Sequence, residues 1–167
     1  YQLGGQALFL SNRDLQIGRG EPVQDTARVL SRYLDGIMIR TYEQKEVEDL
    51  ANYGSIPVIN GLTDFCHPCQ VLADLMTIRE KFAVLEGIKM CYIGDGNNMA
   101  NSLIVGGLKT GMKVSIATPE GYRPHAEVMA FAEGNPDFFI TDDPMKAAEN
   151  ADVVITDTWA SMGMEAE

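Results

Sequence analysis

The stretch with the most reactive side chains is residues 64–70, which reads Asp-Phe-Cys-His-Pro-Cys-Gln. An apolar run with helical spacing follows at once, and Pro68 suits a first helical turn because proline fixes φ and lacks an N–H. We therefore expect His67 and Gln70 to lie at or just inside a helix N-terminus. Free backbone N–H groups and the positive end of the helix dipole favour an anion there. The stretch predicts an anion site that already contains an imidazole and an amide.

Two cysteines flank this histidine, and three readings of them are open. Cys66 and Cys69 form a C-x-x-C at a helix start, as in a thioredoxin-like redox pair. Three predicted strands precede it, however, where the redox fold has a single βα unit. A zinc site is weaker still, because His125 is the only other histidine and Cys91 lies within a predicted strand. The simplest interpretation is that both cysteines only pack, and we assign no metal ligand.

A glycine-containing turn, Gly94-Asp-Gly-Asn-Asn98, follows a predicted strand and opens a predicted helix. A dinucleotide-binding turn has this context, but its third small residue would fall at Met99, so the match is weak. An Asn pair at a helix start is also a good N-cap. Because capping needs only one amide, the second amide favours a ligand.

A cationic side chain, Arg40, follows a strand that should be buried. A guanidinium is costly to bury unless it meets an anion, and its planar fork fits phosphate. The alternative is a structural ion pair, for which the nearby carboxylates are Asp35, Glu43 and Asp64.

Short strands and helices alternate along the chain. Apolar runs predict strands at 6–10, 37–39, 56–60, 88–93, 113–118, 138–140 and 153–156. Helical periodicity and end signals predict helices at 22–34, 43–53, 70–82, 100–109, 124–133 and 143–150. This alternation is typical of an α/β fold with parallel sheets. It restarts after residue 87, so we expect two α/β domains, residues 1–82 and residues 87–167, with the long helix 70–82 joining them.

The polar sets described above fall at the C-terminal ends of predicted strands, where ligands of open α/β sheets bind. Residues 40–41 and 64–70 belong to the first predicted domain, whereas 95–98 and 157–162 belong to the second. A cleft between the domains is therefore the expected site. In the last set, Asp157 could also be an ordinary helix cap and Met162 an ordinary core residue.

Composition narrows the class of protein. The 167 residues are 46% hydrophobic and 22% charged, as in ordinary globular proteins. The net charge of −11 argues against broad binding to nucleic acid or to an anionic membrane. No apolar run approaches the roughly 20 residues of a membrane span. An odd number of cysteines, three, fits a reducing compartment and hence a cytoplasmic location. The chain starts without Met, and both ends look cut, so we expect a piece of a longer protein with both domains incomplete.

Six motifs together resemble the ornithine branch of the aspartate/ornithine carbamoyltransferase family, and the resemblance runs in order along the whole chain. They are Asp25-Thr-Ala-Arg-Val-Leu30, Arg40-Thr41, His67-Pro-Cys-Gln70, Leu72-Ala-Asp-Leu75, Gly94-Asp-Gly-Asn-Asn98 and Asp157-Thr-Trp-Ala-Ser-Met-Gly163. His-Pro-x-Gln is shared with the aspartate branch, whereas Asp-x-x-x-Ser-Met-Gly is specific to the ornithine branch.

The resemblance implies a reaction of arginine metabolism, in which carbamoyl phosphate and L-ornithine give L-citrulline and phosphate without a metal or organic cofactor. It implies carbamoyl phosphate binding by Arg40, His67 and Gln70, of which the first two are also catalytic. It implies ornithine binding by Asn98, Asp157, Ser161 and Met162. Gln16 resembles a residue that family members contribute to the carbamoyl phosphate site of a neighbouring subunit. A homotrimer or a trimer-based oligomer is therefore expected.

Two family motifs do not occur in these 167 residues, namely the Ser-Thr-Arg-Thr-Arg phosphate loop and His-Cys-Leu-Pro. The resemblance therefore makes the longer parent protein the enzyme and predicts that this chain alone is inactive. Two alternatives stay open. The parent could be a carbamoyltransferase for another amine such as putrescine, or the isolated piece could be a non-catalytic ligand-binding or assembly module.

Overall fold

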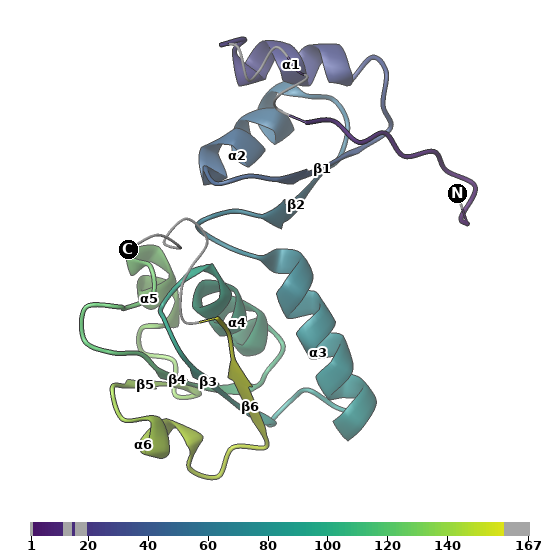
Figure 1. Ribbon diagram of the computed structural model, residues 1–167. Helices are drawn as coiled ribbons and strands as arrows, with labels where there is room; N and C mark the ends of the chain where they lie inside the picture. The colour runs from purple at the N-terminus through teal and green to yellow at the C-terminus, as the bar shows by residue number, and fades with distance from the viewer. Residues whose placement is uncertain (1, 12–14, 16–19, 159–167) are drawn as a thin grey trace. The chain divides into compact units, whose positions relative to one another are not determined.

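The computed structural model describes residues 2–11, 15 and 20–158, and it has the predicted α/β class (Figure 1). Its elements follow one another in the order α1 (Val23–Leu30), β1 (Ile37–Arg40), α2 (Gln44–Tyr53), β2 (Val58–Leu62), α3 (Pro68–Phe82), β3 (Lys89–Ile93), α4 (Asn98–Lys109), β4 (Lys113–Ala117), α5 (Ala126–Ala132), β5 (Phe138–Thr141), α6 (Pro144–Ala148) and β6 (Val153–Thr156). The chain forms two compact units. The first unit comprises Tyr1–Ile39 and Lys45–Ile59, and the second comprises Arg40–Gln44 and Asn60–Glu167.

In the first unit, α1 and α2 bury their apolar faces. Ala27 of α1 is fully buried, and Leu50 of α2 is nearly so. The segment after α1 is tied to the end of α2 through one hydroxyl, because Ser31 Oγ donates to the Ala27 carbonyl at 2.7 Å and accepts from the Ser55 N–H at 3.0 Å. These bonds hold α1 against α2 beside the two-stranded sheet β1-β2.

One predicted strand and the bounds of two other elements in this region differ from the prediction. Residues 6–10 form no strand, and Phe9 is 94% exposed, because an apolar run becomes a strand only when a neighbouring strand pairs with it. The first helix ends at Leu30, where the Ser31 hydroxyl bonds back to the last turn. The strand predicted at 56–60 is Val58–Leu62, since Pro57 has no N–H to give to a ladder.

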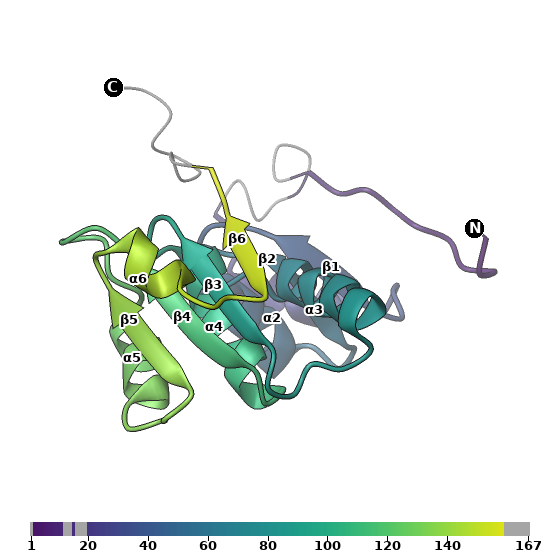
Figure 2. The same ribbon diagram turned by 90° about the horizontal axis from the view of Figure 1, so that it is seen from below.

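The second unit is built on a fully parallel four-stranded sheet in the order β5-β4-β3-β6, which Figure 2 shows side by side. The central strand β3 sets the register, because Met90 lies opposite both Val114 of β4 and Val153 of β6. The carboxyl ends of β3 and β6 therefore lie at one edge of the sheet. This edge presents the residues that follow Ile93 and Thr156.

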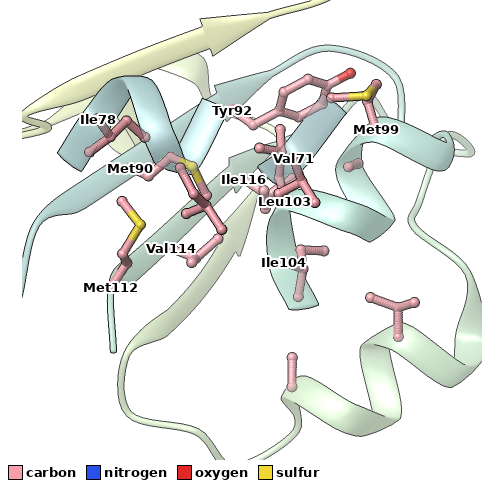
Figure 3. Packing of buried hydrophobic residues seen from close by; sticks show 14 residues of the cluster. Val71, Ile78, Met90, Tyr92, Met99, Leu103, Ile104, Met112, Val114 and Ile116 are labelled. Atoms are coloured by element: carbon pink, nitrogen blue, oxygen red, sulfur yellow. The ribbon is translucent and has the colours of Figure 1, made fainter. Parts of the chain in front are cut away.

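Alternating residues of the central strands divide the core into two layers. On one face, Met90, Tyr92, Val114 and Ile116 pack against α3, α4 and α5 (Figure 3). On the other face, Cys91 and Ala117 pack against Ala147 of α6. The buried hydroxyl of Ser115, between them in this layer, donates to the Ala147 carbonyl at 2.7 Å. The sheet thus has the two-sided cover expected of parallel strands.

The long helix α3 packs within the second unit. Its buried residues Val71, Leu75 and Ile78 belong to the same cluster as Met90 and Leu103. The predicted domains, residues 1–82 and 87–167, therefore differ from the compact units in the placement of α3, and that domain division stays a prediction. Among the described residues, no helix is long and apolar enough to cross a membrane.

Candidate functional site

His67 occupies the predicted place at the start of a helix. It is the N-cap of α3, Pro68 follows in the first turn, and the His67 side chain makes no capping hydrogen bond. The imidazole is half-buried, and its Nδ1 is buried without a hydrogen-bond partner among the described residues. An unsatisfied buried nitrogen is costly. The imidazole thus has hydrogen-bonding capacity that no described residue uses.

The charges around His67 come from three residues of the second unit. Burial lowers the pKa of His67, and the positive charge of Arg40 lowers it further, whereas Asp157 and Asp74 oppose this shift. The structure thus brings Arg40, at the end of β1, and Asp157, just after β6, within electrostatic reach of the imidazole. At neutral pH the ring is neutral, so it offers one N–H donor beside a guanidinium.

Asp157 also acts on a second ring. Burial raises the pKa of Tyr92 strongly, and the negative charges of Asp157 and Asp95 add to the shift. The Tyr92 hydroxyl therefore stays protonated, and it donates to the Asp95 carbonyl at 3.0 Å. The half-buried carboxylate of Asp157 lies at the edge of the sheet where β3 and β6 end. It provides a negative site close to the cationic one.

Gln70 lies in the first turn of α3 and is exposed. Its Nε2 donates to Asp74 Oδ1 at 2.9 Å, a pair that is four residues apart on the same helix. The amide nitrogen of Gln70 is therefore engaged by Asp74. The carbonyl oxygen Oε1 remains as the acceptor that the side chain can offer to a ligand.

The segment that leads to His67 is held by α4. Asn98 Nδ2 donates to the Thr63 carbonyl at 2.7 Å, and Asn101 Nδ2 donates to the Phe65 carbonyl at 2.9 Å. The His67 N–H in turn donates to Ser102 Oγ at 2.8 Å. Every second residue from 63 to 67 thus has a backbone group bound to the first turns of α4.

The two asparagines at the start of α4 do different work. Asn97 is the N-cap, since its Oδ1 accepts from the N–H groups of Met99 at 2.9 Å and Ala100 at 3.3 Å. Asn98 is the amide that capping does not need, as the sequence indicated. Gly96 has a packing reason rather than a dinucleotide one, because a Cβ there would lie 2.3 Å from the Tyr122 carbonyl oxygen.

The cysteines on either side of His67 are thiols and not part of a disulfide. Cys66 Sγ accepts from Asn60 Nδ2 at 3.3 Å, and Cys69 Sγ donates to the Asn60 carbonyl at 3.4 Å. Both thiols thus contact Asn60, the middle residue of β2. Among the described residues, no group of three or more His, Cys, Asp or Glu side chains could hold a metal ion.

Sequence reasoning missed Asn101 and Ser102. Both are nearly buried, with 5% and 6% of their surface exposed. The available signal was two polar residues in the middle of an otherwise apolar helix, because buried polar side chains need partners. Three residues with predicted roles, Gln16, Ser161 and Met162, lie outside the described residues.

Comparison with known proteins decides the family. Residues 1–80 match the carbamoyl-phosphate-binding domain of the aspartate/ornithine carbamoyltransferases, and residues 86–167 match their aspartate/ornithine-binding domain. The chain belongs to the aspartate/ornithine carbamoyltransferase family. The two matches divide the chain at nearly the place where the alternation of strands and helices restarts.

Curated and solved members of this family are highly similar to the chain. It is 58% identical to the ornithine carbamoyltransferase of Pyrococcus abyssi over 99% of its own length and 54% of that protein's. It shares 57% identity and a TM-score of 0.92 with the structure of ornithine carbamoyltransferase from Pyrococcus furiosus, over 98% of this chain and 54% of that one. The anabolic ornithine carbamoyltransferase structure from Campylobacter jejuni matches with 44% identity and a TM-score of 0.91, over 98% of this chain and 56% of that one. The chain spans about half the length of the curated relatives it matches.

Proposed function

We propose that the whole protein transfers the carbamoyl group of carbamoyl phosphate to the δ-amine of L-ornithine, giving L-citrulline and phosphate. The observation that carries this proposal is that the charges of Arg40 and Asp157 both act on the His67 imidazole. A cation, a neutral imidazole at a helix N-terminus and a carboxylate together match an anionic donor and a cationic amino-acid acceptor. The relatives named ornithine carbamoyltransferase support the choice of substrates.

The first half of the site would activate the carbamoyl group. When the neutral δ-amine attacks the carbonyl carbon, negative charge develops on the carbonyl oxygen. The Arg40 guanidinium and the N–H of a neutral His67 would stabilise that charge as preorganised donors. The Oε1 of Gln70, whose Nε2 is held by Asp74, would accept from the carbamoyl NH2. An acetyl group has no such donor, so Gln70 would select carbamoyl over acetyl phosphate.

The second half would hold the amino-acid end of ornithine. Asp157 suits the α-ammonium group, because a carboxylate is its natural partner. Asn98 donates one N–H of Nδ2 to the Thr63 carbonyl, and the other N–H would donate to the α-carboxylate. Ser161 and Met162 complete this half by family resemblance. Holding both reactants in line would supply much of the rate enhancement.

The wider organisation is also part of the proposal. Residues 1–82 would carry most contacts to carbamoyl phosphate, and residues 87–167 those to ornithine. A trimer-based assembly would bring Gln16 into a neighbouring site. The three cysteines, which form no disulfide, fit the reducing cytoplasm.

The proposal is tested by assaying the full-length protein for carbamoylated product with ornithine, putrescine and aspartate as acceptors. Ornithine should give a higher kcat/KM than putrescine, because Asp157 and Asn98 would recognise the α-ammonium and α-carboxylate groups of an amino acid. Putrescine has no α-carboxylate. Acetyl phosphate in place of carbamoyl phosphate is the control for the donor. A preference for putrescine or aspartate would overturn the assignment of the acceptor.

A further inference from the structure

The first turns of α4 hold the His67 segment partly through Asn101 and Ser102, which the proposed chemistry does not use. Asn101 links two segments, since its Nδ2 donates to the Phe65 carbonyl at 2.9 Å and its Oδ1 accepts from the His125 N–H at 2.9 Å. The ring of Phe65 then packs edge-on against that of His125, with 5.0 Å between the centroids. The loop before His67 is thus fixed on both backbone and side chain.

Ser102 forms hydrogen bonds to both halves of the proposed site. Its Oγ accepts from the His67 N–H at 2.8 Å and donates to the Asn98 carbonyl at 2.7 Å. Asn98 returns to the same loop through the Thr63 carbonyl. One hydroxyl therefore connects the backbone of His67, on the carbamoyl side, with that of Asn98, on the ornithine side.

We propose that Ser102 and Asn101 are positioning residues that fix the backbone from Thr63 to His67 and thereby place the His67 imidazole on the transferred group. The inference rests on the proposed function. In that proposed function, neither the Ser102 nor the Asn101 side chain contacts a substrate, and both residues act through His67.

The physical reason is that His67 has few other restraints. Its side chain makes no cap bond, and its Nδ1 has no hydrogen-bond partner among the described residues, so the position of the ring depends strongly on the backbone that carries it. Ser102→Ala would leave the buried-side N–H of His67 without its acceptor, and the loop would shift to find another. A misplacement of about 1 Å in a catalytic group can reduce the rate about 100-fold.

The experiment uses the full-length protein and four variants: Ser102→Ala, Ser102→Thr, His67→Ala and the double variant Ser102→Ala/His67→Ala. Thr110→Ala is the matched control, because Thr110 is the C-cap of α4 and its hydroxyl, among the described residues, bonds only to Gly106 and Gly107 of that helix. The readouts are kcat and KM for carbamoyl phosphate, and the inhibition constant of inorganic phosphate. Circular dichroism checks that each variant is folded.

Ser102→Ala should lower kcat/KM for carbamoyl phosphate by about 10- to 100-fold. The inhibition constant of phosphate, which lacks the carbamoyl group, should not change. Ser102→Thr, which keeps the hydroxyl, and Thr110→Ala should behave like the natural protein. In the His67→Ala background, Ser102→Ala should have almost no further effect, because its route through His67 is already gone.

Independent effects of the two substitutions, or an equal loss of phosphate binding, would overturn the positioning role. If Ser102→Ala does not fold, Asn101→Asp is the second variant, since it keeps an oxygen for the His125 N–H and loses the donor to Phe65. A folded Asn101→Asp with unchanged kcat/KM would also overturn it. A natural protein that forms no citrulline would instead refute the proposed function, so the two failures are distinguishable.

Discussion

Gly106→Ala tests whether close packing of α3 on α4 supports the site. An added Cβ at Gly106 would lie 2.7 Å from Cγ2 of Val71 and 3.5 Å from Cδ1 of Leu75. Carbon atoms in contact normally stay about 3.5–4.0 Å apart, so the first approach is closer by about 1 Å. Val71 is only 6% exposed and its branched side chain has one strongly preferred rotamer in a helix, so α3 itself must move.

Two opposing effects set the size of the change. Replacing Gly by Ala in a helix interior gains about 1 kcal/mol of helix propensity. Overpacking a well-filled core costs about 1–3 kcal/mol. Because the clash meets a stiff side chain, we take the upper half of that range and expect a net loss of about 1–2 kcal/mol in the free energy of unfolding.

The assay is denaturant unfolding of the full-length protein together with kcat/KM for carbamoyl phosphate. Val71 N donates to the His67 carbonyl, so a displaced Val71 should also lower kcat/KM. Val71→Ala is the matched partner, since it removes both methyl groups and alone costs about 1.6 kcal/mol of transfer free energy. The double variant should be more stable than the sum of the two losses predicts, by about 1–2 kcal/mol. A single Gly106→Ala variant that is as stable as the natural protein, or more stable, would refute the packing argument.

Three further predictions concern the site directly. Arg40→Ala should raise KM for carbamoyl phosphate by about 10- to 100-fold, as for a lost charge-assisted hydrogen bond of about 1.5–3 kcal/mol. Arg40→Lys should restore only part of the affinity, because lysine lacks the planar fork of the guanidinium. An unchanged saturation curve for Arg40→Ala contradicts this role. The pKa of His67 is depressed below its ordinary 6.5, so the unfolded chain binds the proton first and stability should fall as pH drops through about 6.5. A His67→Gln variant, measured across the same pH range, should lose that part of the pH dependence. If the natural protein and the variant have equal profiles of stability against pH, His67 is not its source. Asn97→Ala should cost about 1 kcal/mol of stability through the lost cap while leaving KM for ornithine unchanged, whereas Asn98→Ala should raise that KM.

The sequence predicted the fold well wherever local signals and burial agreed. Helix α3 was predicted to within two residues, because Pro68 and an apolar stripe mark its start and inward face. The strands of the second unit are apolar runs bounded by turns, and they form as expected. Residues 6–10 failed because pairing is a property of two segments, and no single segment reveals its partner.

The predicted site residues were correct in position more often than in contacts. Placing His67 at a helix N-terminus and Asp157 after a strand required only local rules. The sequence placed Arg40 and His67 in one expected site, but it did not reveal that the charge of Arg40 acts on the imidazole, because α2 and β2 separate the two residues along the chain. The roles of all these residues stay predictions until substrates are tested.

Asn98 shows how far a local argument can reach. Two adjacent amides at a helix start were one more than capping requires, and Asn97 alone does provide the cap. The second amide favoured a ligand at Asn98, and this stays a prediction, because Asn98 also has a structural partner in the Thr63 carbonyl. An amide nitrogen carries two hydrogens, however, so one bond to the loop leaves a second donor in a fixed direction. A ligand that accepts from it would be held by the same side chain that holds the loop before His67, which is why the loop and the amino-acid half of the site should respond together when either is changed.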